Sequence, residues 1–236
     1  MTQISDPMRQ WQSGALGRAL IGAEARLLSD ALDDVFGLEL LQLGAWGMGR
    51  ELLAGCRICR QTLLDGGGAS ADGDIRADLS RLPVGSGIID AVLLPHTLEL
   101  VVDPHAVLRE ADRVLGGEGR LLVLGFRPLS PWGLRAATRS GYPPGLRRTL
   151  SESRVRDWLI LLGYEVVLQR RYLYRWPVSP RQGAQEAMDS VLRRGWFYPW
   201  PASGYLIKAR KRLYTLTPVR PRLPRLKLGT LVEPSA

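Results

Sequence analysis

The sequence contains only two cysteines and two histidines, and this scarcity limits its metal chemistry. The cysteines are Cys56 and Cys59, whereas His96 and His105 lie far downstream. A structural zinc site takes four such ligands at short, regular spacings, so we expect no metal site. For the two cysteines, a redox-active pair or disulfide is one interpretation, and two reduced side chains on an ordinary helix are the other, which we favour.

The sequence also lacks a long apolar run. No stretch approaches the roughly 20 apolar residues of a membrane-spanning helix. Residues 1–11 show no basic segment followed by an apolar one, as an export signal would. We therefore expect a cytoplasmic protein with no membrane partner. A chain of 236 residues with 45% hydrophobic and 23% charged residues can bury one substantial core, and we expect one main domain.

Lysine is scarce, with 3 residues against 29 arginines, and the excess of basic charge lies in the C-terminal third of the chain, where residues 166–203 carry 6 basic and 2 acidic side chains. Residues 1–165 carry 18 basic and 20 acidic side chains, whereas residues 204–236 carry 8 and 1. The segment 213–236 is rich in proline and arginine, can bury little and is expected to be a flexible tail. It either binds nucleic acid through its charge or only keeps the protein in solution.

What the sequence does contain is a strand followed by a glycine-rich loop. A helical period runs over residues 8–36 and ends at Gly37, and the start of this helix either packs beside a sheet or folds over a ligand site as a lid. The apolar run 38–43 then leads into glycines at 44, 47 and 49 and a predicted helix from Arg50. This order opens the ligand crevice of a doubly wound α/β domain. The glycine spacing differs from the dinucleotide pattern G-x-G-x-x-G, which argues against a nicotinamide-dependent oxidoreductase.

A second strand is predicted over residues 61–65, and it ends in Asp65, 21 residues after Gly44. In doubly wound folds an acid at this separation accepts hydrogen bonds from ribose hydroxyls. The alternative is that Asp65 only opens the turn at Gly66 to Gly68. Further buried strands are predicted at 88–94 and 119–126, with a helix between them that starts at Asp103-Pro104.

Later elements follow the same alternation of helix and strand. A capping box at Thr149 to Glu152 predicts a helix that stops at Gly163. Strands are predicted at 164–168 and 205–209, with a helix over 180–194 between them. The stretch 127–148 is irregular and is either a substrate-contacting insertion or a plain surface connection.

The segment from Ile75 to Phe126 resembles a known family, and the resemblance extends over roughly residues 38–126. It contains D-x-S-x-L-P, then I-D-A-V, L-E, D-P and the block L-R-E-A-D-R-V-L-G-G-E-G-R-L-L-V. This order is similar to class I S-adenosylmethionine-dependent methyltransferases of the type 11 branch, and LLQLGAWG with HTLE looks like a poorly characterised proteobacterial group within it. The resemblance implies an α/β, Rossmann-like, doubly wound sheet of seven strands, with helices on both faces and the last strand antiparallel. The methyltransferase-like domain would span 38–212, after an N-terminal helical segment at 1–37.

The resemblance also implies a cofactor, S-adenosylmethionine (SAM), and residues that contact it. The loop from Gly44 to Gly47 would face its methionine part, Asp65 the ribose, and Asp78 with Leu79 the adenine. The full implied set is Gln42, Gly44, Ala45, Trp46, Gly47, Asp65, Asp78, Leu79, Pro95 and His96. The family usually has an acid at the position of Gln42 and G-x-G-x-G after it, and this chain departs from both. A neutral amide offers no charge complement to the amino group of the cofactor.

Methyl transfer from a sulfonium needs alignment and exclusion of water more than a catalytic triad. If the acceptor must lose a proton, His96 is the candidate base; the alternative is that it only bonds within its loop. Our leading hypothesis is a methyltransferase acting on a small molecule, with RNA as another acceptor. The second is a non-catalytic binding or regulatory module of the same fold.

An aromatic and basic segment at 170–203 is relevant to the RNA alternative. Aromatic side chains alternate there with arginines such as Arg170 and Arg171. Such a mixture either forms a stacking, phosphate-neutralising surface or fills a sheet edge with arginine stems lying over it.

Overall fold

The computed structural model describes residues 6–47, 49–66, 73–138, 143–174 and 201–212. The predicted helix at 180–194, the tail at 213–236 and most of the aromatic segment lie outside these ranges. No helix within the described ranges is long and apolar enough to cross a membrane.

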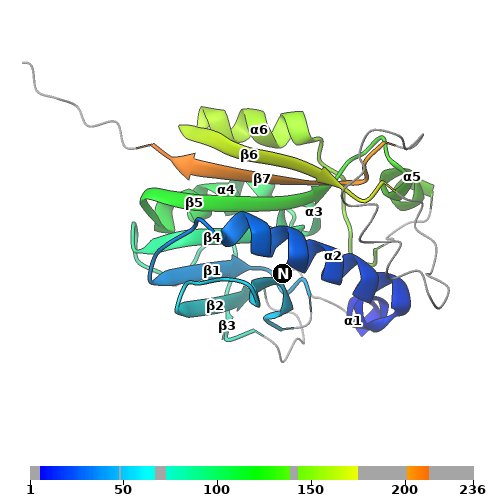
Figure 1. Cartoon of the computed structure of the whole chain (residues 1–236), viewed down its shortest axis with the longest axis horizontal. Coiled ribbons are helices and arrows are strands. Elements are labelled where there is room, and N and C mark those ends of the chain that lie inside the picture. Colours follow the sequence, from blue (N-terminus) through cyan, green and yellow to red (C-terminus); the bar gives the residue numbers. More distant parts are fainter. Residues whose placement is uncertain (1–5, 48, 67–72, 139–142, 175–200, 213–236) are drawn as a thin grey trace, which may run out of the picture.

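Seven strands form one twisted sheet in the order β3-β2-β1-β4-β5-β7-β6 (Figure 1). The first five are parallel: β1 (Glu39–Leu43), β2 (Arg60–Asp65), β3 (Ile75–Arg76), β4 (Ile89–Pro95) and β5 (Leu115–Phe126). The last strand, β7 (Gly204–Lys211), is antiparallel to both of its neighbours, β5 and β6 (Tyr164–Tyr172). The predicted seven-stranded sheet with an antiparallel last strand is confirmed.

Helices cover both faces of this sheet. The helix α2 (Ala15–Leu32) lies across one face, over a core that includes Leu40, Leu93 and Leu122 (Figure 1). The helices α3 (Thr97–Leu100), α4 (Pro104–Val114) and α6 (Glu152–Leu161) contribute to a second core on the other face. Successive strand residues alternate between the two cores, because side chains on a strand point to opposite faces. The predicted doubly wound α/β architecture is therefore present.

The N-terminal segment differs from the single helix predicted over 8–36. The chain forms α1 (Asp6–Ser13) and then α2, with a break at Gly14, whose backbone is extended. The end of α2 is attached to the sheet by Lys208 of β7, whose buried amine donates to the carbonyl of Ala31 at 3.0 Å and pairs with Asp34. This attachment fixes the direction in which α2 crosses the strands.

Other helix starts were predicted with varying success. Asp103 caps α4 as predicted, because its carboxylate accepts from the backbone N–H groups of His105 and Ala106 at 2.9 and 3.1 Å. The cap of α6 is Ser151, whose hydroxyl accepts from the Arg154 N–H at 3.3 Å, and the prediction of a capping box at Thr149 was wrong. The helix expected from Arg50 is only a short 3-10 turn, η1 (Glu51–Leu53). The short α5 (Pro131–Thr138) lies in the irregular stretch after β5.

Candidate functional site

The candidate site lies where strand order reverses, at the carboxyl ends of β1 and β4. These strands are parallel neighbours, and β1 pairs with β2 on its other side, so the connections leave in opposite directions. Such a switch point leaves a crevice in which doubly wound domains bind ligands. The loop after β1 begins at Gly44 with φ +95°, and a Cβ there would lie 2.9 Å from the Thr97 hydroxyl oxygen. Glycine is therefore required at the first position of the loop.

Gln42 folds this loop back over the end of its own strand. Its side chain is buried, and its Nε2 donates to the carbonyls of Gly44 and Trp46 at 3.1 and 3.2 Å. Its Oε1 is buried without a hydrogen-bond partner among the described residues. The amide thus shapes the loop and keeps one acceptor atom unused, which is an uncommon state for a buried polar atom.

Trp46 turns into the protein from the middle of the loop. Its side chain is 1% exposed, and its indole Nε1 donates to Oε2 of Glu24 at 2.7 Å. Its ring centroid lies 4.4 Å from that of His96 and 5.7 Å from that of Trp11 in α1. Trp46 therefore fills the space between the loop after β1 and the tip of β4, under the N-terminal helices.

His96, directly after β4, is held between two carboxylates. Its Nε2 lies 2.9 Å from Oε1 of Glu24, and its Nδ1 lies 2.9 Å from Oε2 of Glu99. Its backbone has φ +55°, a left-handed conformation that is rare outside glycine. Burial lowers the pKa of His96, but the charge and hydrogen bond of Glu24, together with those of Glu99, outweigh burial and raise it to about 9. The ring is therefore an imidazolium at neutral pH, and both nitrogens donate.

Glu24 and Glu99 each have further donors. Glu24 Oε1 also accepts from the Tyr172 hydroxyl at 2.8 Å, and Glu99 Oε1 accepts from the backbone N–H groups of Phe126 and Leu150 at 3.0 and 3.2 Å. Burial raises the pKa of Glu99, and burial with the nearby charge of Glu24 raises that of Tyr172. The three acid–base groups around His96 thus form one buried, coupled network.

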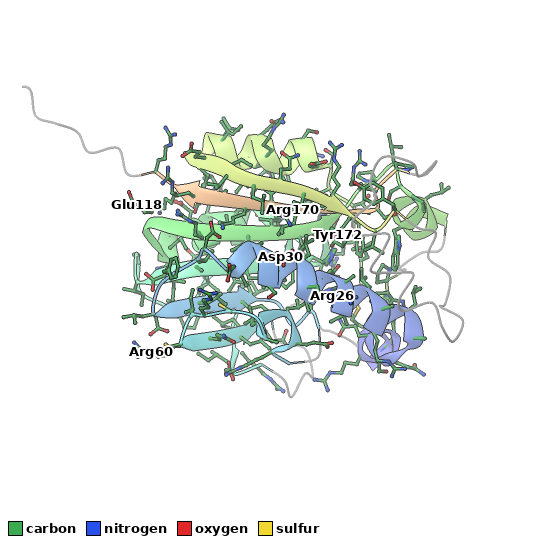
Figure 2. The ribbon with its side chains drawn as sticks, viewed as in Figure 1. Arg26, Asp30, Arg60, Glu118, Arg170 and Tyr172 are labelled. Carbon is green, nitrogen blue, oxygen red and sulfur yellow. The ribbon has the colours of Figure 1, made fainter. Side chains whose placement is uncertain are left out.

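Tyr172 reaches this network from the end of β6 because its register partner is a glycine. Gly204 of β7 lies opposite Tyr172, and a Cβ at Gly204 would come within 2.4 Å of the phenol ring. The ring therefore lies over Gly204, and its hydroxyl reaches Glu24 of α2. Two residues earlier on β6, Arg170 faces Asp30 of α2 at 3.6 Å (Figure 2).

Aromatic rings surround the network at the carboxyl ends of β4 and β5. Phe126 stacks on His96 with centroids 4.1 Å apart, and Trp132 of α5 stacks on Phe126 at 5.5 Å with an interplanar angle of 5°. Trp11 meets Trp132 edge to face at 6.2 Å. We call this group the aromatic cluster; its members are Trp11, Trp46, His96, Phe126 and Trp132.

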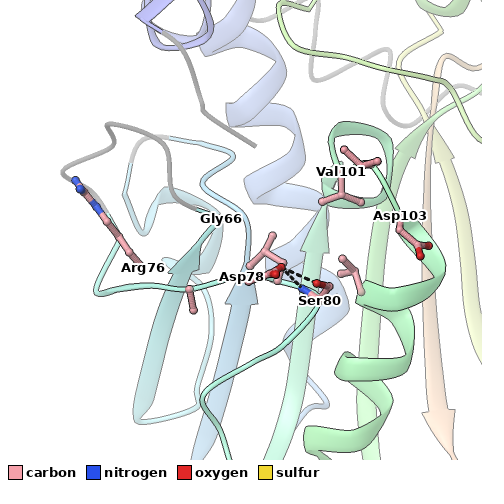
Figure 3. Close-up of a pocket in the computed structure, with 10 residues that line it drawn as sticks. Gly66, Arg76, Asp78, Ser80, Val101 and Asp103 are labelled. Atoms are coloured by element: carbon pink, nitrogen blue, oxygen red, sulfur yellow. Dashed lines mark hydrogen bonds between the residues drawn. The ribbon is translucent and has the colours of Figure 1, made fainter. Parts of the chain in front are cut away.

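An open cavity of about 500 Å³ lies over the ends of β2 and β3 (Figure 3). Gly66, Asp78 and Leu79 line one side of it, and Val101, Asp103 and Val107 line the other. The Asp78 carboxylate accepts from the hydroxyl and the backbone N–H of Ser80 at 2.7 and 2.9 Å, and these hydrogen bonds lower its pKa. The buried Asp65 immediately precedes Gly66, at the rim of this cavity.

The structure divides the predicted site residues into two groups. Asp78 and Leu79 line the cavity, and Asp65 is next to it. Gln42, Gly44, Ala45, Trp46, Gly47, Pro95 and His96 lie at the ends of β1 and β4, and among the described residues that line the cavity none belongs to this set. The predicted residues thus lie on two sides of the switch point, of which one is open and the other is filled by Trp46.

Three members of the network were missed by sequence reasoning, namely Glu24, Glu99 and Tyr172. Glu24 did leave a signal, because it follows Leu20 and precedes Leu28 at a spacing of four, on the apolar face of a helix. A charged residue at such a position is almost never fully buried unless it is paired. Both cysteines are free, with Cys59 exposed, and no group of metal-ligating side chains occurs in the described ranges.

Comparisons with known proteins agree with this geometry. The family model of a methyltransferase domain matches residues 52–123. The chain is 33% identical over 170 residues to the uncharacterized protein YafS of Escherichia coli (strain K12), covering 69% of this chain and 67% of that protein. It is 32% identical over 119 residues to the demethylmenaquinone methyltransferase of Mycobacterium tuberculosis (strain ATCC 25618 / H37Rv), and this match spans about half of each protein, 50% and 48%.

Solved structures share the fold at low identity. A SAM-dependent methyltransferase from Thermotoga maritima has a TM-score of 0.62 at 16% identity, covering 86% of this chain and 94% of that one. A geranyl diphosphate methyltransferase in complex with SAM has a TM-score of 0.56 at 18% identity, covering 84% and 91%. These solved structures identify the fold, and the family follows from the match to YafS over two thirds of its length together with the family model. The chain belongs to the class I SAM-dependent methyltransferase family.

Proposed function

We propose that this protein binds SAM and transfers its methyl group to a small-molecule acceptor. The observation that carries the proposal is the open cavity at the ends of β2 and β3, next to a filled crevice at the ends of β1 and β4. In a doubly wound domain these adjoining places hold the two halves of a nucleotide-type cofactor. The family assignment says which cofactor to test first.

The residues of the open side fit an adenosine group. Asp65, at the end of β2, has a carboxylate suited to accept from ribose hydroxyls, and Leu79 with Val107 offers apolar walls for a flat base. Asp78 lies beside Leu79 at the mouth of the cavity. On the other side of the crevice, Gln42 also fits the cofactor, because its Oε1, which has no partner among the described residues, can accept from the amino group of the cofactor.

The methionine side is closed in this conformation by Trp46. Binding of the full cofactor therefore requires Trp46 to leave its place between Gly44 and His96, and this breaks its hydrogen bond to Glu24. A protein whose competent state is a minority binds its ligand more weakly by the fraction that is competent. The loop geometry thus predicts modest affinity for the full cofactor.

The bound cofactor supplies a methyl group already activated by a sulfonium charge. The chain aligns the acceptor and excludes water, and the aromatic cluster, with Phe126 and Trp132 stacked, offers flat apolar walls for this purpose. We propose that His96 takes the acceptor proton. Because its ring is an imidazolium in the closed network, its Nε2 proton must first pass to Glu24 as that contact opens, which leaves a neutral ring that can accept the proton of the acceptor.

A small acceptor is also supported by a relative. The demethylmenaquinone methyltransferase named above acts, by its name, on a quinone-type molecule, although the match spans half of that protein. The basic residues near the C-terminus leave RNA as the second acceptor to test.

Isothermal titration with SAM, its demethylated product and NAD tests the cofactor. We expect binding of the first two and none of NAD. Absence of binding of both S-adenosyl compounds at millimolar concentration would refute the proposal. Incubation with methyl-labelled SAM and separate pools of quinones, other small aromatic compounds and RNA then tests the acceptor.

A second candidate function is a non-catalytic binding module of the same fold. The burial of Trp46 and the uncharged Gln42 favour it, because both reduce the space and charge available to the methionine part. Tight binding of the demethylated product, with no transfer to any acceptor pool, would support this module over the enzyme.

A further inference from the structure

A second cavity, of about 370 Å³, lies outside the crevice and is lined by arginines. Arg127 is the first residue after β5, whereas Arg171 lies on β6 and Arg156 on α6. Ser151, Ser153, Gln169 and Leu129 complete much of its wall. The cavity thus gathers side chains from the end of β5 and from the consecutive elements α6 and β6.

The charge of this cavity is not balanced from within. Glu152 is the carboxylate among its lining residues, with a side chain 7% exposed. Its two oxygens already accept from Gln169 Nε2 and, at 2.8 Å, from Arg171 Nε. Three guanidinium groups and one carboxylate leave two positive charges, and each guanidinium carries five N–H donors.

The arginines also have donors to spare. Arg171 uses only its Nε among the described residues, and Arg156 has one ion pair there, to Asp157 at 3.8 Å. Arg127 donates to the Ala202 carbonyl at 3.3 Å and lies 3.9 Å from Glu152. The ion pair with Asp157 lowers the surplus to one positive charge. Planar guanidinium forks bind phosphate oxygens in pairs, and the three terminal oxygens of a phosphate group use more of these donors than the two oxygens of a carboxylate do.

We propose that this arginine cavity binds the phosphate group of a phosphorylated small molecule. Arg127 directly follows Phe126, whose ring belongs to the aromatic cluster, so the bound phosphate sits at the same end of the sheet as the proposed acceptor site. The phosphorylated molecule is then the methyl acceptor. This last step rests on the proposed function, whereas phosphate binding does not.

Isothermal titration of the full-length protein at constant ionic strength tests the site, with inorganic phosphate, phenyl phosphate and acetate as probes. We expect both phosphates to bind, phenyl phosphate the more tightly because its ring adds apolar contact, and acetate to bind least. The double variant Arg156→Gln/Arg171→Gln should weaken phosphate binding about tenfold or more. Arg210→Gln is the matched control, because Arg210 also lies on this sheet and pairs with a glutamate, Glu165, at 2.9 Å. It should bind phosphate like the unaltered protein.

Four results would overturn the inference. These are no binding of either phosphate at millimolar concentration, equal weakening in the control, no weakening in the double variant, and equal affinity for acetate. A short single-stranded RNA that binds more tightly than phenyl phosphate, and loses this affinity in the double variant, would overturn the small-molecule assignment. If the unaltered protein binds phosphate but does not bind SAM, the proposed function is refuted and the phosphate site is not.

Discussion

Oε1 of Glu24, on the N-terminal helix α2, lies 2.9 Å from Nε2 of His96 at the tip of β4, across 72 positions of sequence. Neither side chain is exposed to solvent. The same carboxylate accepts from Trp46 and Tyr172, so it joins the helix, the loop after β1 and the strand β6 at one point. Buried ion pairs of this kind are costly to break, because each partner then loses its compensation.

Glu24→Gln should therefore destabilise the protein although it keeps the shape of the side chain. Removing Glu24 leaves the buried charge of His96 with Glu99 as its one remaining carboxylate partner, and we expect a loss of about 3 kcal/mol in the free energy of unfolding. Urea denaturation measures it. The control is Glu39→Gln, which removes a surface ion pair with Arg60 and should cost less than about 1 kcal/mol. Equal losses in the two variants would contradict the role of Glu24.

The pH dependence of stability follows from the same network. His96 has a pKa raised to about 9 in the folded protein against an ordinary value near 6.5, so its stabilisation is complete below pH 6.5 and is lost as pH rises toward 9. We expect the free energy of unfolding to fall by up to about 3 kcal/mol between pH 6.5 and 9.5.

Denaturation across this range in two variants isolates the contribution of His96. His96→Gln should flatten the profile, and His105→Gln, at the chain's other histidine, should keep it. The raised pKa of Glu99 acts with the same sign, which is why the comparison between variants is needed, whereas the pKa of Tyr172 is raised from an ordinary value near 10 and affects stability only above this range. A steep profile in His96→Gln would assign the pH dependence to Glu99 instead.

Trp46→Leu should open the crevice and tighten the binding of SAM by about tenfold, because less of the binding energy is spent on displacing the indole. Adenosine, which needs only the open cavity, should bind as before. Calorimetry with both ligands measures this. Trp158→Leu is the control, since Trp158 is a half-buried tryptophan packed on His105 at 4.1 Å and is not among the described residues that line the cavity. Weaker SAM binding in Trp46→Leu would mean that the indole contacts the cofactor.

Asp65→Asn should weaken the binding of both SAM and adenosine by about tenfold or more, because a charge-assisted hydrogen bond to the ribose is lost. Equilibrium dialysis with each ligand tests it. Asp90→Asn serves as the control: its carboxylate accepts from the backbone N–H groups of Leu38 and Glu39 at 2.6 and 3.0 Å, at the opposite end of the sheet. Unchanged affinity in Asp65→Asn would place the ribose elsewhere.

The sheet was predictable from sequence because its signals are local. The apolar runs at β4 and β5 and the cap at Asp103-Pro104 are each contained within a dozen residues. The break at Gly14 was not predicted, because apolar residues continue on one face through both helices. The capping residue of α6 was not predicted either, because only the folded chain shows that Ser151, and not Thr149, brings its hydroxyl to the Arg154 N–H.

The site was predictable only in part. The residues after β1, β2 and β4 could be placed, since the carboxyl ends of parallel strands share one edge. Whether Trp46 points into the crevice or away depends on a partner on a helix that precedes the sheet. Contacts of such long range leave no local pattern, and Tyr172, 148 positions from Glu24, is the extreme case.

The position of Glu24 also bears on where the protein can be cut. Residues 38–212 contain all seven strands and would pass as a minimal methyltransferase fragment. That fragment would leave the indole of Trp46, the phenol of Tyr172 and one nitrogen of His96 without the acid they share. Shortened or tagged versions of this protein should keep α1 and α2, because α2 supplies the shared carboxylate of Glu24 and α1 supplies Trp11, which packs on Trp46.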